Sequence, residues 1–179
     1  MKRINFLAIA IVIIVASAFT ITQVDSWKIA SNYSVKFSGT KVTGIFSVLK
    51  GSITFNENDL KNAKMDMEID VNSIKTGKDK MDEHAKNSSW FDAVKYPKIT
   101  FKSSGFSKAT TGYSVSGELN LHGIKKQVSI PFTFANKGKE GEFNGFIEIN
   151  RKDYGINGNM FSFMVGDVFD IQIKVPVKE

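Results

Sequence analysis

The sequence predicts an all-β fold, an antiparallel barrel of eight to nine strands with one short helix capping or flanking it. From Trp27 onward, apolar and polar residues alternate with a period of two, which is typical of strands with one buried and one wet face. Turn-forming residues such as Gly39-Thr40 separate the alternating runs. A polar face on nearly every strand indicates one sheet layer that closes or folds on itself. A two-sheet sandwich gives the same alternation, so both arrangements stay open.

The strands follow one another along the chain. The most regular alternation spans residues 27–37, 65–71, 113–121, 128–134 and 169–175. Shorter strands fit residues 42–49, 51–56, 98–106 and 141–150. In the last of these, Phe143 and Phe146 fall out of phase around Gly145, which predicts a β-bulge. A closed barrel with this number of strands is wide enough to hold one ligand.

One helix is predicted between the strands that end near residue 71 and begin near residue 98. Thr76 is the expected N-cap, with Asp79 three residues later. The residues that follow at helical spacing are Met81, His84, Ala85, Ser88 and Phe91. Tyr96-Pro97 is expected to stop the helix. The helix either plugs one end of the barrel or covers an edge of its core.

The first residues have the order of a secretory signal. Lys2 and Arg3 precede an apolar run over residues 4–15, and Ala16-Ser17-Ala18 supplies small residues for cleavage. We predict a signal peptide over residues 1–18 and one domain over residues 19–179. The alternative is an uncleaved anchor, since the apolar stretch reaches Ile21. Either reading places the remaining chain outside the cytoplasm, in the periplasm or secreted.

Composition excludes several classes of site. The chain has no cysteine, which rules out disulfides, thiolate nucleophiles, zinc–thiolate centres and iron–sulfur clusters. The net charge is +6, and loss of Lys2 and Arg3 leaves 6 − 2 = +4. The only arginines are Arg3 and Arg151, and the lysines are interleaved with acidic residues, so we expect no nucleic-acid partner. The charge favours solubility and transient contact with an anionic membrane.

We expect no catalytic residue and no metal site. His84 and His122 are the only histidines, and zinc sites need three or four ligands with known spacing. The sequence has no Gly-x-Ser-x-Gly elbow and no phosphate-binding glycine motif. His84 is expected to make a hydrogen bond where the helix contacts the barrel. Arg151 either meets an acidic ligand head group or, as we favour, forms a structural ion pair with Asp82 or Asp153.

Short motifs follow one another in a fixed order: Phe46 through Gly51 to Phe55, Val71–Gly77, Asp82–His84, Trp90–Asp92, Tyr96–Phe101, Gly117–Ile124, Ile149–Gly155 and Val165–Val168. In this order and spacing, the chain resembles the YceI-like family of exported lipid-binding proteins. Two positions depart from the family's pattern. Met81 stands where the family often has Arg, and Ala85 where it often has Leu.

The resemblance implies a lipocalin-like barrel that binds a polyisoprenoid lipid or a related amphiphile, such as a quinone, for carriage or storage in the cell envelope. It implies no covalent chemistry, no enzymatic activity and no cofactor besides the bound lipid. A homodimer is left open. Two alternatives remain: an enzyme that acts on a lipid or quinone through His84 or His122, and a structural β-domain with a filled core.

The 15 phenylalanines indicate either a filled core or a lined cavity. For a cavity, the expected wall consists of Phe37, Phe46, Phe55, Met65, Met67, Ile69, Phe91, Phe101, Val115, Leu119, Phe132, Phe134, Phe169 and Ile171. His84 and Arg151 mark the expected polar end, where a head group would lie.

Overall fold

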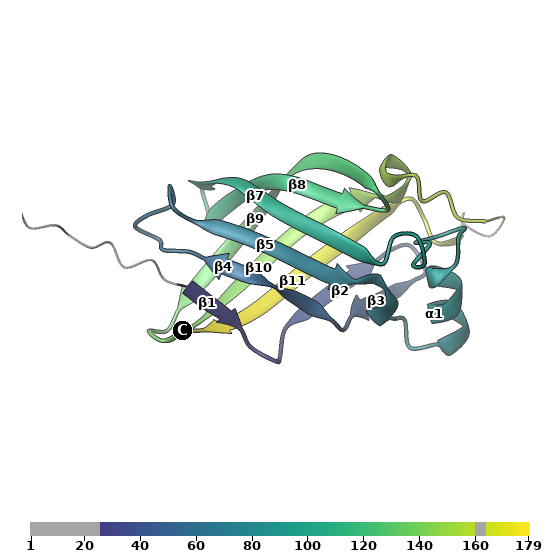
Figure 1. The fold of residues 1–179 in the computed structure, drawn as a ribbon, viewed down its shortest axis with the longest axis horizontal. Coiled ribbons are helices and arrows are strands. Elements are labelled where there is room, and N and C mark those ends of the chain that lie inside the picture. The colour runs from purple at the N-terminus through teal and green to yellow at the C-terminus, as the bar shows by residue number, and fades with distance from the viewer. Residues whose placement is uncertain (1–25, 160–163) are drawn as a thin grey trace, which may run out of the picture.

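The computed structural model describes residues 26–159 and 164–179 (Figure 1). Its strands are β1 (Ser26–Ile29), β2 (Ser34–Ser38), β3 (Thr43–Phe46), β4 (Leu49–Thr54), β5 (Lys64–Asp70), β6 (Ile74–Lys75), β7 (Lys98–Lys108), β8 (Tyr113–Leu121), β9 (Ile124–Asn136), β10 (Glu140–Asn150) and β11 (Val168–Lys178). Its helical elements are η1 (Val71–Ser73), α1 (Asp79–Lys86) and η2 (Arg151–Tyr154). The predicted signal peptide lies outside the described residues. Among those residues, none belongs to a helix with the length and hydropathy needed to cross a membrane.

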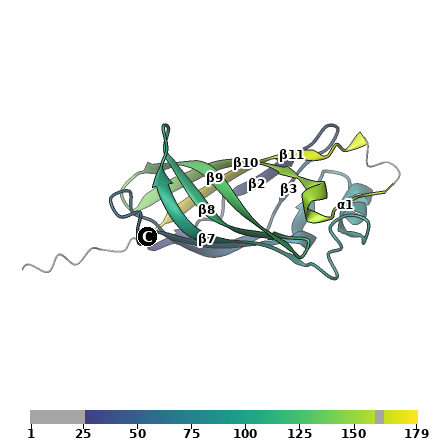
Figure 2. The same cartoon turned by 90° about the horizontal axis from the view of Figure 1, so that it is seen from above.

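The sheet closes into a barrel, as predicted. Antiparallel neighbours run in the order β1-β4-β5-β7-β8-β9-β10-β11, and β11 pairs again with β1. This closure decides for the barrel and against the sandwich. Eight strands form the ring. β2 pairs with β11, β3 pairs with β2, and β6 pairs with β3. α1 lies at one end of the barrel (Figure 2).

Three interruptions of the strands lie at about the same level, and the first of them divides the predicted strand over residues 27–37 in two. β1 and β2 are separated at residues 30–33, β3 and β4 at residues 47–48, and β5 and β6 at residues 71–73. The Tyr33 hydroxyl donates to the Ser47 carbonyl at 2.9 Å and accepts from the Leu49 amide at 3.1 Å. The Ser73 hydroxyl accepts from the Val48 amide at 3.1 Å. Side-chain hydroxyls thus satisfy backbone groups where the strands are interrupted.

The predicted bulge at Gly145 is wrong. β10 pairs with β11 without interruption, and Gly145 lies opposite both Ile173 and Phe132. The phase change arises because Phe146 points outward, with 43% of its surface exposed, whereas Phe143 is buried. The register shifts instead in β7, between Ser103 and Gly105, where it faces β8.

β9 and β10 are paired over only part of their length. The pairs run from Gly141 opposite Asn136 to Gly145 opposite Phe132. Beyond them, β9 stays paired with β8 and β10 with β11, each to its end. Pro131, which has no N–H to donate, stands where the two strands separate. We call the separated part, residues 124–131 and 146–150, the β9–β10 seam.

The helix is shorter than predicted, and its N-cap is Lys78, not Thr76. Thr76 has another partner: its hydroxyl and its amide each donate to Asp82 Oδ1 at 2.7 Å. Asp82 is 4% exposed, so these bonds hold α1 against β6. After Lys86 the chain continues in turns as far as Pro97. Ser88 and Phe91, which were predicted as part of the helix, therefore lie in the turns that follow it.

Aromatic rings fill the end of the barrel opposite α1. Phe55 is fully buried, and its ring centroid lies 5.2–5.5 Å from the rings of Tyr113, Phe132, Phe134 and Phe143. These edge-on contacts are the arrangement that aromatic pairs favour. We call the set the aromatic floor; it consists of Trp27, Phe55, Phe106, Tyr113, Phe132, Phe134 and Phe143.

We expect Phe55→Ala to lower the free energy of unfolding by about 3–5 kcal/mol, since truncation leaves a cavity among rings that cannot collapse. Phe146→Ala, on the outer face of β10, is the matched control and should change it by less than about 1 kcal/mol. Denaturant unfolding measures both values. Equal effects of the two substitutions would contradict a packed floor.

Candidate ligand-binding cavity

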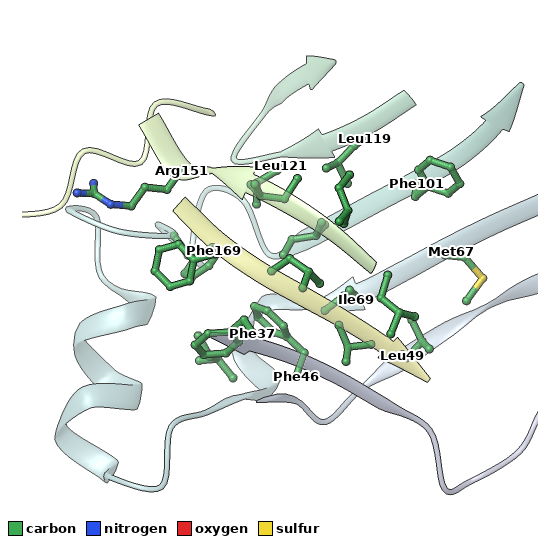
Figure 3. Close-up of a pocket in the computed structure, with 18 of the residues that line it drawn as sticks. Phe37, Phe46, Leu49, Met67, Ile69, Phe101, Leu119, Leu121, Arg151 and Phe169 are labelled. Atoms are coloured by element: carbon green, nitrogen blue, oxygen red, sulfur yellow. The ribbon is translucent and has the colours of Figure 1, made fainter. Parts of the chain in front are cut away.

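Between the aromatic floor and α1, the barrel is hollow (Figure 3). The cavity has a volume of about 590 Å³, within the range of pockets that hold small ligands. Its wall is formed by the inward-facing positions of the strands. Inward side chains such as Met67, Ile69 and Ile171 are only half-buried because they face this space. The filled-core alternative therefore does not describe this half of the molecule.

The structure places all but two of the predicted wall residues on this cavity. Those on it are Phe37, Phe46, Met65, Met67, Ile69, Phe91, Phe101, Val115, Leu119, Phe132, Phe169 and Ile171. Phe55 and Phe134 lie elsewhere, in the aromatic floor. Both point inward as predicted, but at the level where the barrel is filled. The alternation of a strand fixes which face a residue lies on, and it does not fix the level along the barrel axis.

Several wall residues were not predicted. Ile99, Leu121, Ile130, Ile147 and Ile173 share the inward phase of their strands, so the same alternation would have found them. Others come from turns and carry no periodic signal. These are Trp90, Ile156, Met164 and Val165.

Two glycines shape the wall differently. A Cβ at Gly117 would lie 2.7 Å from the Phe101 ring, so this glycine leaves room for that ring. At Gly145 the nearest atom to an added Cβ is Ile130 Cγ2, at an ordinary contact distance of 3.5 Å. Gly145 lines the cavity, and a side chain there would take up cavity space.

The cavity opens at the α1 end. Its wall is apolar except for a few side chains, namely Thr76, His84, Thr100, Arg151 and Asn159. Among the described wall residues, the exposed ones are His84, Asn159 and Met164, all near α1 or η2. The polar part of the wall and the opening to solvent therefore coincide.

Arg151 lies beside this opening as a structural clamp. The side chain is 4% exposed, and its guanidinium donates to the carbonyls of Ile156, Asn157 and Gly166 at 2.6–2.8 Å. Its ion-pair partner is Asp167, at 2.7 Å. Pairing with Asp82 or Asp153 was predicted and is wrong, because their carboxylates are bound by Thr76 and Lys75, and by Lys126, respectively. Hydrogen bonding to Lys152, with further stabilisation by Arg151, lowers the pKa of Asp167.

The two histidines do not form one site. His84 is exposed on α1 and lines the cavity, and the described part of the chain offers its ring no hydrogen bond, contrary to the prediction. His122 lies outside the cavity wall. Its Nδ1 is 3.0 Å from the Tyr154 carbonyl oxygen, and its ring packs on Tyr96. In the described ranges, three or more His, Cys, Asp or Glu nowhere converge as metal ligands would.

Asp82 ties α1 to the barrel electrostatically. The hydrogen bond from the Thr76 hydroxyl is the main reason that the pKa of Asp82 is lowered, with help from the Thr76 amide and Lys75, while burial opposes the shift. A carboxyl group whose pKa is lower in the folded than in the unfolded chain stabilises the fold above its unfolded pKa. That stabilisation is lost as the pH falls through the folded pKa.

We expect Thr76→Val to lower the free energy of unfolding by about 1 kcal/mol at neutral pH. The difference from the wild type should shrink as the pH falls below the pKa of about 3.9 for an unfolded Asp, because the wild type then loses the extra stabilisation. Denaturant unfolding across this pH range measures it, with the exposed Thr133→Val as control. Parallel pH profiles for wild type and Thr76→Val would argue against the Thr76–Asp82 bond as the cause.

A closed antiparallel barrel with an apolar cavity open at one end belongs to the class of small β-barrels that hold a hydrophobic ligand inside. The sequence model of the YceI-like domain matches residues 19–177, and the chain belongs to this family.

A UPF0312 protein of Vibrio parahaemolyticus is 30% identical over 125 residues, which are 67% of this chain and 66% of that protein. The chain thus aligns with just under two thirds of this relative. The crystal structure of Burkholderia cenocepacia BcnA has a TM-score of 0.79 and 24% identity, covering 83% of this chain and 99% of that one. The structure of a polyisoprenoid-binding domain from Saccharophagus degradans has a TM-score of 0.65 and 15% identity, covering 87% of this chain and 99% of that one. These structural likenesses confirm the fold.

Proposed function

We propose that the barrel binds one long-chain isoprenoid, or a related amphiphilic lipid, without covalent chemistry. The observation that carries the proposal is the apolar cavity of about 590 Å³ above the aromatic floor. The family supports it, and so does the structural neighbour described as a polyisoprenoid-binding domain. The protein acts as a binding protein and not as an enzyme.

Burial of the prenyl chain supplies the binding affinity. A prenyl chain gains roughly 25 cal/mol for each Å² of apolar surface removed from water. Lost chain entropy and the membrane as the ligand's alternative environment offset most of this gain. Met65 and Met67 suit an irregular chain because thioether side chains adapt their shape, while the phenylalanines supply stiff walls. The floor limits how far the chain can enter.

The head group would lie at the open end, beside His84 and Arg151. His84 is accessible there, whereas most donors of Arg151 already bind carbonyls and Asp167. A quinone ring is one head group that fits this place, since it needs few hydrogen bonds. We propose that the exported protein carries or stores this lipid in the periplasm or outside the cell, and contacts the membrane transiently to exchange it.

Mass spectrometry of an organic extract of the purified native protein tests the proposal, and we expect a prenyl lipid in near-stoichiometric amount. Gly145→Leu should reduce the bound lipid several-fold, because the added side chain enters the cavity. Gly105→Leu is the matched control, since an added Cβ at Gly105 meets no atom within 4 Å, and it should retain the wild-type amount.

An extract without lipid, from protein that also fails to take up an added prenyl lipid, would overturn the proposal. So would Gly145→Leu protein that folds like the wild type and keeps the full amount of lipid. Unfolding by denaturant establishes that both glycine variants are folded.

A further inference from the structure

Among residues 26–159 and 164–179, large apolar side chains are exposed toward the open end of this barrel and not at the filled end. Within the described ranges, the exposed large apolar residues are Ile45, Val94, Ile124, Phe146, Met164 and Val168. Val94, in the turns before β7, is 96% exposed. All but Phe146 lie in the loops or strand ends at the open end of the cavity, and Phe146 lies on the α1-side half of β10.

These residues surround the opening. Val94 lies in the turns before β7, next to Tyr96, whose ring packs on His122 in the turn that leads to Ile124. Val168 begins β11 opposite Asn150, and the Val165 carbonyl accepts from the Thr40 amide at 3.1 Å, in the turn before β3 and Ile45. Loops and strand ends around the opening thus contribute exposed apolar side chains. We call Ile45, Val94, Ile124, Met164 and Val168 the apolar rim.

The loops at the filled end are different. They span residues 55–63, 109–112 and 137–139, and they contain mostly Asn, Thr, Lys and acidic residues. None of the exposed large apolar residues of the described chain belongs to them. A general tolerance for surface hydrophobics would not segregate them to the end where the cavity opens.

The open end of the barrel also carries positive charge. The segments at the open end span residues 39–42, 71–97, 122–123 and 151–167, including β6, α1 and η2. They hold eight basic and six acidic side chains, so the balance is 8 − 6 = +2. Lys78, Lys80 and Lys95 are exposed, and no salt bridge to them occurs among the described residues. Lysines beside exposed apolar tips are the combination that binds the interface of an anionic bilayer.

We propose that the apolar rim docks the open end of the barrel onto an anionic lipid bilayer. The tips of Val94 and Val168 enter the interface and the lysines meet lipid phosphates. Apolar side chains on separate loops and strand ends suit a fluid surface better than a rigid protein partner, which would need a continuous patch. The proposal deepens the proposed function, because a docked barrel lets a lipid chain pass between leaflet and cavity without crossing water.

Vesicle flotation tests the docking surface. We expect the wild-type protein to float with vesicles of phosphatidylcholine and phosphatidylglycerol, and less with phosphatidylcholine alone. Val94→Asp combined with Val168→Asp should weaken binding about tenfold or more. Neither residue lines the cavity. Ala109→Asp combined with Thr111→Asp, at the filled end, is the matched control and should bind like the wild type.

Charge reversal at lysines of the two ends gives a second pair of variants. Lys78→Glu with Lys95→Glu should abolish the preference for phosphatidylglycerol, whereas Lys137→Glu with Lys139→Glu, the same change at the filled end, should leave it intact. Wild-type protein that binds neither vesicle would overturn the proposal, as would equal losses in the open-end and filled-end variants. A wild-type dimer that the Val94 and Val168 substitutions dissociate would assign the rim to a second copy instead.

Lipid extraction separates this proposal from the function itself. If the Val94/Val168 variant keeps its bound lipid and loses vesicle binding, the rim acts in docking and the cavity in binding. If the wild type neither contains nor takes up a prenyl lipid and still docks through the apolar rim, the cavity proposal fails while the docking surface stands.

Discussion

Ring packing around Phe55 divides the interior of this barrel into a filled and a hollow half, and most other features follow from that division. The edge-on contacts of Phe55 with four neighbouring rings make a packed floor in which Phe55 is fully buried. Because the floor supplies a compact core, the other half can leave apolar side chains facing an empty space. Each apolar side chain that faces an empty space loses dispersion contacts on that side, and the packed floor offsets part of this loss.

Polar interactions beside the opening hold in place the segments that surround the hollow half. Arg151 binds three backbone carbonyls and Asp167, and so fixes the segments around η2 that border the opening. Asp82, held by Thr76, does the same for α1 on the other side. Both charged groups are almost fully buried, yet each is paired, which satisfies the requirement that buried charge has partners. The polar groups thus shape the cavity without lining its depth.

Sequence reasoning gave the class of fold and most of the wall, because period-two alternation reports which face of a strand a residue occupies. It could not place Phe55 and Phe134 at the level of the floor, since alternation carries no information about height along the axis. It read Phe146 as a sign of a bulge because a large apolar residue was expected to point inward. The spacing predicted Thr76 as an N-cap, because its contact with Asp82 depends on how α1 packs beside β6, which the sequence pattern does not report. The same holds for Arg151, whose partner Asp167 lies 16 residues away.

The β9–β10 seam gives the wall of the hollow half a mechanical property that the floor lacks. Ladder hydrogen bonds stop at Gly145 and Phe132, so the two strands beyond them can separate further without breaking any bond of the sheet. Ile130 on one strand and Ile147 on the other face the cavity across this seam. A thicker occupant would be accommodated by spreading these strands at little energetic cost, while the ring contacts of the floor resist compression. Tolerance for occupants of different girth would then be a property of the backbone, and a limit on their length a property of the side chains.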